Sequence, residues 1–335
     1  MGYKCISLRK FGGPEVLEVE KRETEPDPQK GEVRIKVLAT SAAYTDTLIR
    51  RGIYPDVKEK PPIVPGYDMV GVVDKLGDGV TEFAEGEKVA ELTTIGAYSE
   101  YMTLPAARLV PVPDDVDHAE AISLILTFVT AYQMLTRMAK LTSGRSVLIH
   151  GACGAVGNAL VQLGSILKLK MYGTASKSQH GYLREFGCVP IDYESEDFVR
   201  EVGKRERNGV DAVFDPIGGE NFRRSLKTLG KGGKLVAFGS YNAGSGMELI
   251  VDFLRVKVWN ITPWLPATTF YSIGAWHKKR HSWFREDLTK LFQWLSEGKI
   301  KPAVRKKMKL EEAAVAHELV ENNRVKGKIV LLVNQ

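Results

Sequence analysis

The first part of the chain carries short segments in which hydrophobic and polar residues alternate. Residues 33–37 (Val-Arg-Ile-Lys-Val) place apolar and charged side chains in turn, which is the pattern of a half-buried strand. Further short apolar segments, separated by Gly, Asp and Pro, lie at residues 66–73, 88–90 and 98–103. Apart from a short helix expected over 44–51, this dense series of strands and turns predicts a compact barrel-like β domain.

From residue 118 onward the pattern changes to helices that alternate with strands. A helix is predicted over 118–140. Strands are then predicted at 146–150, 169–174, 210–214, 234–238 and 256–262, and helices at 155–168, 179–186, 197–204 and 221–229. Such alternation predicts a doubly wound parallel sheet of the Rossmann type, covered by helices on both faces.

The last part of the chain predicts two helices, near 284–296 and 310–322, and a final strand over 327–333. A strand outside the alternating array is expected to return to the first domain. We therefore expect an α/β protein of two domains, with residues 1–122 and 266–335 in the β-rich domain and 123–265 in the parallel-sheet domain. The length of 335 residues agrees with about two domains.

Composition narrows the class of protein. Hydrophobic residues make up 44% and charged residues 26%, which excludes a disordered chain. The longest apolar run, 121–135, is too short and too interrupted to predict a membrane span, and the N-terminus has no apolar signal core. With three cysteines, a disulfide framework is not expected, and a reducing, cytoplasmic location fits better.

The net charge of +6 is concentrated in residues 276–309, which hold eleven Lys or Arg against three Asp or Glu. We interpret this segment as a solvated helix face, since it lacks a nucleic-acid-binding motif, and nucleic acid is not an expected partner. His277 and His281 are spaced by four residues, as in a metal-binding helix. They lack a flanking acid, so we expect them to be solvated helix histidines.

A glycine-rich turn follows the strand predicted at 146–150. It reads Gly-Ala-Cys-Gly-Ala-Val-Gly over 151–157 and opens a predicted helix. Gly154 would let a pyrophosphate approach the backbone, Gly157 would let the helix pack on the strand, and the N–H groups near Ala155 and Val156 would face the phosphates. The turn therefore predicts a dinucleotide site, although a tight turn without a ligand has the same residues.

The end of the next predicted strand indicates which nicotinamide cofactor binds. An NAD site usually has an acidic residue there, but residues 121–184 contain no Asp or Glu. Ser176 and Lys177 instead offer a hydroxyl and an ammonium group, which suit a 2′-phosphate. The sequence therefore predicts NADPH.

Four blocks in fixed order give the chain a family resemblance. They are residues 51–55 (Arg-Gly-Ile-Tyr-Pro), 65–73, 150–157 and 211–219. Together they resemble the medium-chain dehydrogenase/reductase superfamily, in its zinc-free quinone oxidoreductase (zeta-crystallin-like) branch. The resemblance implies a GroES-like β-barrel domain, a Rossmann domain, and a C-terminal segment that returns to the β domain.

The resemblance also implies roles for individual residues. Thr130 would lie beside the nicotinamide, Tyr54 would line the same cleft, and Tyr193 would join Ser176 and Lys177 around the 2′-phosphate. The floor under the nicotinamide would be formed by two short runs, Phe238-Gly239-Ser240 and Ile261-Thr262-Pro263. Zinc-dependent relatives have a Cys and a His where this chain has Ala43 and Tyr67, and Asp68 alone is not a metal site. No metal is therefore expected.

Without zinc to polarise a carbonyl, similarity points to hydride transfer from NADPH to a quinone or an α,β-unsaturated carbonyl. Tyr54 and Tyr67 are candidate catalytic residues, with packing or cleft lining as the alternative. Two other functions stay open: an enoyl-thioester or 2-alkenal reductase, and a non-catalytic NADPH-binding protein that associates with RNA or a membrane surface. We also expect a homodimer through the strand predicted at 256–262, as an edge strand normally needs a cover.

Overall fold

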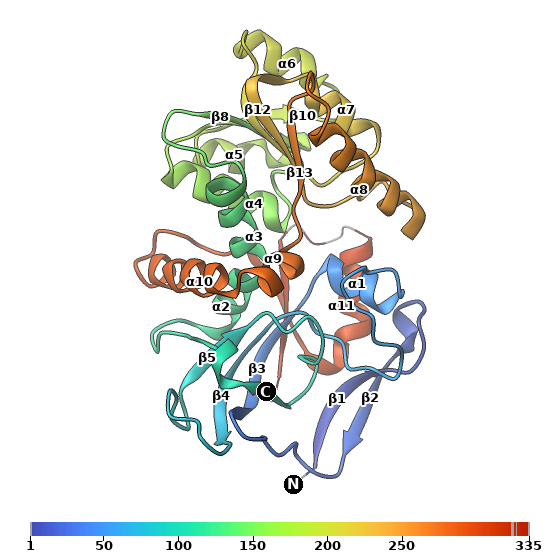
Figure 1. Cartoon of the computed structure of the whole chain (residues 1–335), viewed down its shortest axis with the longest axis vertical. Coiled ribbons are helices and arrows are strands. Elements are labelled where there is room, and N and C mark those ends of the chain that lie inside the picture. Colours follow the sequence, from blue (N-terminus) through green and yellow to red (C-terminus); the bar gives the residue numbers. More distant parts are fainter. Residues whose placement is uncertain (1, 323–324, 326, 334–335) are drawn as a thin grey trace. The chain divides into compact units, whose positions relative to one another are not determined.

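The computed structural model describes residues 2–322, 325 and 327–333. The chain divides into two compact units, Met1–Val129 with Gly274–Gln335, and Thr130–Ile273, which we call unit 1 and unit 2 (Figure 1). The divisions follow Val129 and Ile273, whereas the sequence placed them after residues 122 and 265.

Unit 1 is built on a seven-stranded sheet of order β14-β15-β3-β4-β5-β7, with β6 also paired to β3. Its strands are β3 (Glu32–Ala42), β4 (Met69–Leu76), β5 (Lys88–Glu91), β6 (Tyr101–Pro105), β7 (Val110–Pro111), β14 (Val304–Lys309) and β15 (Lys328–Leu332). A separate hairpin pairs β1 (Tyr3–Leu8) with β2 (Leu17–Arg22). The alternation seen over 33–37 is confirmed, because Val33, Ile35 and Val37 are fully buried.

The predicted return of the chain's last strand is confirmed. β15 lies between β14 and β3 and pairs antiparallel with β3. The helices of unit 1 are α1 (Tyr44–Arg50), α2 (His118–Ser123), α9 (Ile273–Lys279, from Gly274 on), α10 (His281–Ser296) and α11 (Ala313–Glu321), with short turns η1 (Pro14–Val16), η2 (Ala106–Arg108) and η6 (Leu310–Glu312).

Unit 2 contains a six-stranded parallel sheet of order β10-β9-β8-β11-β12-β13. The strands are β8 (Ser146–Ile149), β9 (Lys170–Ala175), β10 (Cys188–Asp192), β11 (Val210–Asp215), β12 (Leu229–Ala237) and β13 (Ala267–Phe270). Helices α4 (Ala155–Ile166), α5 (His180–Glu185), α6 (Phe198–Arg205), α7 (Glu220–Leu226) and α8 (Gly246–Asn260), with the short turn η5 (Lys177–Gln179), cover both of its faces (Figure 1). The doubly wound architecture is therefore confirmed.

The prediction of a strand at 256–262 was wrong. These residues belong to helix α8 and the turn after it, and the edge strand is β13 instead. Helix α8 begins at Ser245, whose side chain accepts a hydrogen bond from the N–H of Glu248. Its two buried residues, Asp252 and Val256, are four apart, which is the helical period. Strands β10, β13 and β14 were not predicted.

The helical stretch from His118 to Met138 contains two segments of π-helix, η3 (Leu124–Phe128) and η4 (Met134–Met138), with α3 (Val129–Gln133) between them. By length and composition, its 21 residues would suffice to cross a membrane, with a mean hydropathy of 1.3. However, 83% of the apolar window is buried within the protein, as in the core helix of a globular domain.

Candidate functional site

The glycine turn of unit 2 joins β8 to α4. Gly154 is the N-cap of α4, and its N–H donates to the carbonyl of Gly151 at 2.9 Å. A Cβ atom added at Gly157 would lie 2.1 Å from the oxygen of Gly151 and 2.7 Å from the Cα of Ala152. Since both neighbours are backbone atoms, position 157 requires glycine for the helix to pack this closely on the turn.

The first turn of α4 offers free hydrogen-bond donors. Among the residues that the structure describes, no partner is found for the N–H groups of Ala155, Val156 and Gly157. The chain resumes helical bonding at Asn158, whose N–H donates to Gly154 at 2.8 Å. Three donors at the positive end of a twelve-residue helix form a cradle that fits the pyrophosphate of a dinucleotide.

The residues predicted to bind a 2′-phosphate lie at one edge of the sheet. Ser176 and Lys177 follow β9, and Tyr193 follows β10, which is the neighbouring strand. Ala175 and Asp192 are partners in the parallel register, so the residues that follow them leave the sheet side by side. Lys177 and Tyr193 are exposed, with 57% of Tyr193 accessible.

An acidic residue that the sequence analysis missed stands at the same edge. The Asp192 carboxylate accepts hydrogen bonds from the Ser195 hydroxyl at 2.6 Å and from the N–H of Glu194 at 3.2 Å. These bonds, with the nearby positive charges of His180 and Lys177, lower the pKa of Asp192. Asp192 lies beyond residues 121–184, the stretch without Asp or Glu that includes the glycine turn.

At the other side of the sheet, the predicted run Phe238-Gly239-Ser240 follows the carboxyl end of β12. The hydroxyl of Ser240 donates a hydrogen bond to the buried carboxylate of Asp252. Gly239 packs closely on Pro216, because a Cβ atom added at Gly239 would lie 3.1 Å from the carbonyl oxygen of Pro216. The predicted partners Ile261 and Pro263 lie elsewhere: they precede β13, at its amino end, because residues 256–260 are helical. The residues at the carboxyl end are Tyr271 and Ser272.

Thr130 lies in α3, directly after the η3 segment of π-helix and Val129. It is 5% exposed, and its hydroxyl oxygen has no hydrogen-bond partner among the described residues. Buried hydroxyl groups are normally paired, so this hydroxyl is available to a ligand or a water molecule. Segments of π-helix are frequent at functional sites.

In unit 1, two tyrosines form a pair. The hydroxyl groups of Tyr54 and Tyr67 are 2.7 Å apart, and their rings meet edge to face with centroids 5.7 Å apart. Tyr67 is fully buried, and its burial, followed by the neighbouring Tyr54, raises its pKa well above 10. A Cβ added at Gly274 would lie 2.7 Å from the Tyr67 hydroxyl and 3.0 Å from a carboxylate oxygen of Asp56, so the backbone of α9 closes over the pair.

Two buried carboxyl groups belong to the same unit. Asp68 accepts a hydrogen bond from the hydroxyl of Ser41 at 2.6 Å and lies 3.3 Å from the Lys328 ammonium. Asp46 accepts one bond, from the N–H of Ala43 at 3.0 Å, while its other oxygen has no partner within the described ranges. Burial, and then the charge of Asp68, raise the pKa of Asp46 to about 8, so Asp46 is a neutral acid at pH 7. No pattern in the sequence predicts this shift.

The positions of the zinc ligands in related dehydrogenases have no metal-binding chemistry here. Ala43 offers a methyl group, and the Tyr67 phenol is held protonated. The remaining carboxylate, Asp68, is already bound to Ser41 and Lys328. This donor set does not fit zinc.

The prediction for His277 and His281 was wrong. His277 is only 8% exposed, and its Nε2 atom lies 2.8 Å from a carboxylate oxygen of Glu91. The acid that the sequence analysis did not find beside these histidines comes from β5, far earlier in the chain.

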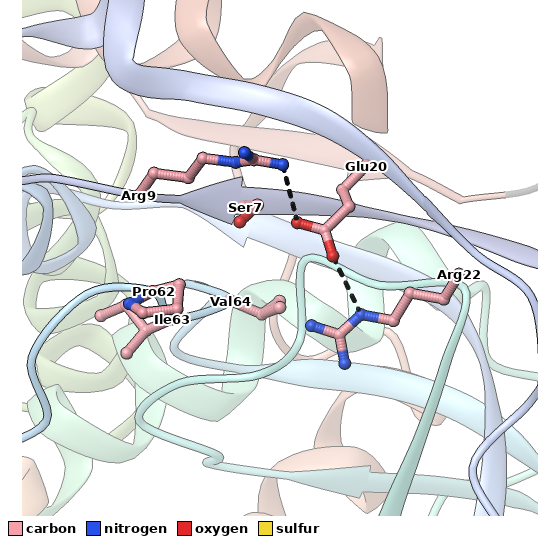
Figure 2. Close-up of a pocket in the computed structure, with 7 residues that line it drawn as sticks. All are labelled: Ser7, Arg9, Glu20, Arg22, Pro62, Ile63 and Val64. Carbon is pink, nitrogen blue, oxygen red and sulfur yellow. Dashed lines mark ion pairs between the residues drawn. The ribbon is translucent and has the colours of Figure 1, made fainter.

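A hollow beside the β1–β2 hairpin is lined by Ser7, Arg9, Glu20, Arg22, Pro62, Ile63 and Val64 (Figure 2). Its charged groups pair with each other, since Glu20 lies 3.9 Å from Arg9 and 3.6 Å from Arg22. It carries none of the predicted site residues.

Comparison with known proteins gives matches along most of the chain. The family "Alcohol dehydrogenase GroES-like domain" matches residues 29–114, and the family "Zinc-binding dehydrogenase" matches residues 188–331. The chain is 33% identical to a 2-haloacrylate reductase from Burkholderia sp., with 97% of each chain covered. It is 30% identical to the rat synaptic vesicle membrane protein VAT-1 homolog, over 98% of this chain and 84% of the relative. The structure of Escherichia coli quinone oxidoreductase complexed with NADPH matches with a TM-score of 0.85 and 26% identity, over 98% of this chain and 99% of that chain.

Proposed function

The chain belongs to the medium-chain dehydrogenase/reductase superfamily, in its zinc-free quinone oxidoreductase branch, and from this premise we propose that it reduces a quinone or an α,β-unsaturated carbonyl compound with NADPH. The observation that carries the proposal is the glycine turn of unit 2. Its three unpartnered N–H groups, counted among the described residues, are a feature that a bound pyrophosphate explains, and the close packing at Gly157 holds the helix that carries them.

NADPH, when bound, supplies the hydride. The groups of unit 2 that would hold it are the N–H donors of α4, the Ser176 hydroxyl and the Lys177 ammonium, with Tyr193 beside the adenosine. Thr130 would bond the nicotinamide amide, since its buried hydroxyl is otherwise without a partner among described residues. The preference for NADPH over NADH rests on Lys177, which is exposed and free to meet a 2′-phosphate.

The chemistry of unit 1 supports a conjugated acceptor. A quinone or enone spreads the arriving negative charge over its own oxygen, so hydrogen-bond donors suffice where a simple ketone would need a Lewis acid. Tyr54, the more accessible tyrosine of the pair, would donate to that oxygen, and Tyr67, whose raised pKa keeps it protonated, would hold Tyr54 in place through the contact between their hydroxyl groups. The proton that completes the reduction would come from solvent or from Tyr54.

The proposal is tested by following NADPH oxidation with a panel of acceptors: a benzoquinone, an enone, a 2-alkenal, an enoyl thioester and a saturated ketone. We expect turnover with at least one conjugated acceptor and none with the saturated ketone. The Tyr54→Phe variant should lose kcat by about tenfold or more, since one oxyanion donor is worth about 10²–10³-fold in known cases. Tyr101→Phe, on β6, is the matched control. Absence of turnover with every conjugated acceptor would contradict the proposal.

We also propose that the protein is a homodimer. The support comes from the exposed apolar residues on and after α8, namely Met247, Ile250, Val251, Leu254, Val258, Ile261 and Trp264. Next to this helix, β13 is the edge of the sheet among the described strands. A second copy would cover both features by a symmetric contact.

The VAT-1 relatives favour a second candidate function, association with a membrane surface, because their name places them at vesicles. The same apolar residues around α8 are its physical basis, since an exposed apolar face also suits a lipid interface. Cosedimentation with vesicles of neutral and anionic lipid distinguishes the reductase function from association with a membrane surface. A dimer that stays in the supernatant supports the enzyme alone, and binding without any turnover supports the second function.

A further inference from the structure

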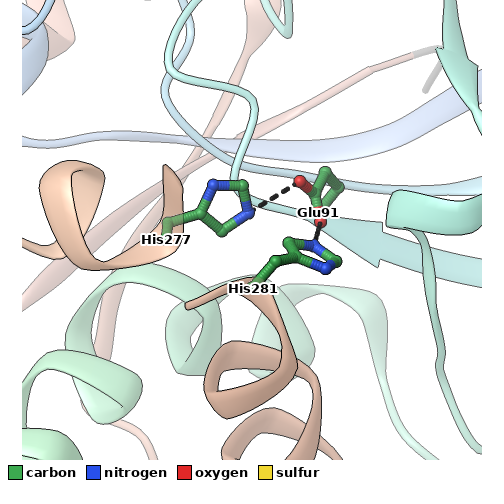
Figure 3. A group of neighbouring side chains, drawn as sticks. All are labelled: Glu91, His277 and His281. Carbon is green, nitrogen blue, oxygen red and sulfur yellow. Dashed lines mark ion pairs between the residues drawn. The ribbon is translucent and has the colours of Figure 1, made fainter. Parts of the chain in front are cut away.

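Three side chains of unit 1 converge on one point (Figure 3). Glu91 ends strand β5, His277 lies on α9, and His281 is the first residue of α10. The His277 Nε2 atom is 2.8 Å from one Glu91 oxygen, and the His281 Nε2 atom is 3.7 Å from the other. One ligand atom from each residue lies within 4.8 Å of the other two.

The polar atoms at this point are not satisfied by hydrogen bonds. Both Nε2 atoms and the Oε2 atom of Glu91 are buried, and none has a hydrogen-bond partner among the residues described. The His277 Nε2 atom lies 2.8 Å from Oε1, a distance at which a protonated imidazole pairs with the carboxylate and a neutral one is placed to share an ion with it. Three such atoms facing each other in a buried place would be costly unless something binds them.

Arg108 binds one oxygen of the Glu91 carboxylate and leaves the other available to a ligand. Its Nε and Nη2 atoms donate to the Oε1 atom of Glu91 at 3.1 and 2.9 Å, which leaves Oε2 available. Burial raises the pKa of Glu91, but the contacts with His277, His281 and Arg108 outweigh it and the pKa is lowered. The Arg108 guanidinium and the two imidazoles thus all face this one carboxylate.

The two imidazoles are held in place by aromatic packing. Their ring centroids are 4.8 Å apart with planes at 83°, and His277 also lies edge-on to Phe284 at 4.8 Å. Phe284 itself is 1% exposed. Rings fixed in this way keep their nitrogen atoms directed at the same place without large rearrangement.

We propose that Glu91, His277 and His281 bind one divalent transition-metal ion of the zinc class. Two imidazole nitrogens and one carboxylate oxygen are a donor set that suits zinc, cobalt and nickel better than calcium or magnesium. Water would complete the coordination. The ion would tie the end of β5 to the junction between α9 and α10. Its ligands include neither Ala43 nor Tyr67, so its binding can be measured without turnover.

The test uses the full-length protein after treatment with a chelator and dialysis. Titration with Co²⁺ should give visible d–d absorption that saturates at one ion per chain, and calorimetry with Zn²⁺ should give the same stoichiometry with submicromolar affinity. Trp276 and Trp283, which stack at 5.2 Å beside the two histidines, should report binding by a change in fluorescence. None of these signals depends on turnover.

Variants separate the site from adventitious binding. His281→Asn and His277→Asn should each weaken Zn²⁺ binding by about 100-fold or more, since loss of even an outer-shell partner costs 10–100-fold. His118→Asn is the matched control, because His118 also faces a carboxylate, that of Asp117 at 3.9 Å, but has no second histidine. It should bind as the unmodified chain does.

A stability measurement guards against variants that fail to fold. Zn²⁺ should raise the thermal midpoint of the unmodified protein and of His118→Asn, but not that of His281→Asn, whose position is 28% exposed and tolerates change. If the unmodified chain binds less than one ion, or if His281→Asn binds as tightly as the control, the proposal is overturned.

Discussion

The glycine turn yields the sharpest prediction, because two glycines in it meet different amounts of free space. At Gly157 an added methyl group would lie 2.1 Å from a backbone oxygen, which is 1.3 Å inside the ordinary contact limit of 3.4 Å. At Gly154 the same addition would lie 3.3 Å from that oxygen, only 0.1 Å inside the limit. The two positions therefore separate the cost of distorting the turn from the cost of blocking the phosphates.

For Gly157→Ala we expect a loss of about 1–3 kcal/mol in the free energy of unfolding, the range for overpacking where the neighbours are rigid. The affinity for NADPH should fall with it, since the N–H groups of α4 move. For Gly154→Ala we expect a change in stability within about 0.5 kcal/mol. Its NADPH dissociation constant should still rise at least about tenfold, or about 1.4 kcal/mol, because the methyl group occupies the path of the pyrophosphate.

Gly203→Ala is the matched control. Gly203 lies inside α6 of the same unit, and nothing lies within 4 Å of an added Cβ. This substitution should stabilise the protein by about 0.5–1 kcal/mol and leave NADPH binding unchanged. Urea denaturation measures the stability and calorimetric titration the affinity. Unchanged NADPH binding by a folded Gly154→Ala protein would refute the assignment of this turn to the pyrophosphate.

Three further predictions concern other parts of the molecule. Lys177→Ala should weaken NADPH binding by about 1–3 kcal/mol, the range for bonds to charged groups, and leave NADH unchanged; equal losses for both would refute the 2′-phosphate role. Burial raises the pKa of Asp46 from its ordinary 3.8 to about 8, so the folded state holds the extra proton and stability should fall as pH rises from about 4 to 8. Asp46→Asn should flatten that part of the stability curve in urea denaturation, and an unchanged slope would contradict the assignment. Leu254→Lys on α8 should shift the protein from dimer to monomer in sedimentation, and a monomeric unmodified protein would refute the dimer.

The parts of the fold that the sequence predicted are those fixed by local chemistry. The turn at 151–157 needs glycine for reasons that involve only its own neighbours, so its motif is legible in isolation. The prediction of a strand over 256–262 failed because the β-branched and apolar side chains there have the pattern of a strand. The helix is set instead by the cap at Ser245 and by the burial of Asp252 and Val256 one turn apart, which only the tertiary structure reveals.

In the candidate site too, local sequence predicted some features, and tertiary contacts determine the others. Ser176 and Lys177 follow β9 as the spacing from the glycine turn predicts, and their role at a 2′-phosphate stays a prediction. Ile261 and Pro263 were misplaced together with the strand predicted at 256–262. Glu91 could not be connected with His277 and His281, because the sheet brings them together from distant parts of the chain. The raised pKa of Asp46 likewise depends on burial beside Asp68, which no spacing in the sequence encodes.

The position of β15 between β14 and β3 has a consequence for how the protein is made. When residues 1–129 leave the ribosome, β6 can already pair with residues 32–36 of β3, but residues 39–42 have to wait for their partner at 329–332, about 200 residues later. At about 5–20 residues per second, that interval is on the order of 10–40 seconds. Unit 2 is continuous in sequence and is complete before then. The later-numbered unit can therefore fold first on the ribosome, while the nascent β3 edge is the segment that chaperones must shield.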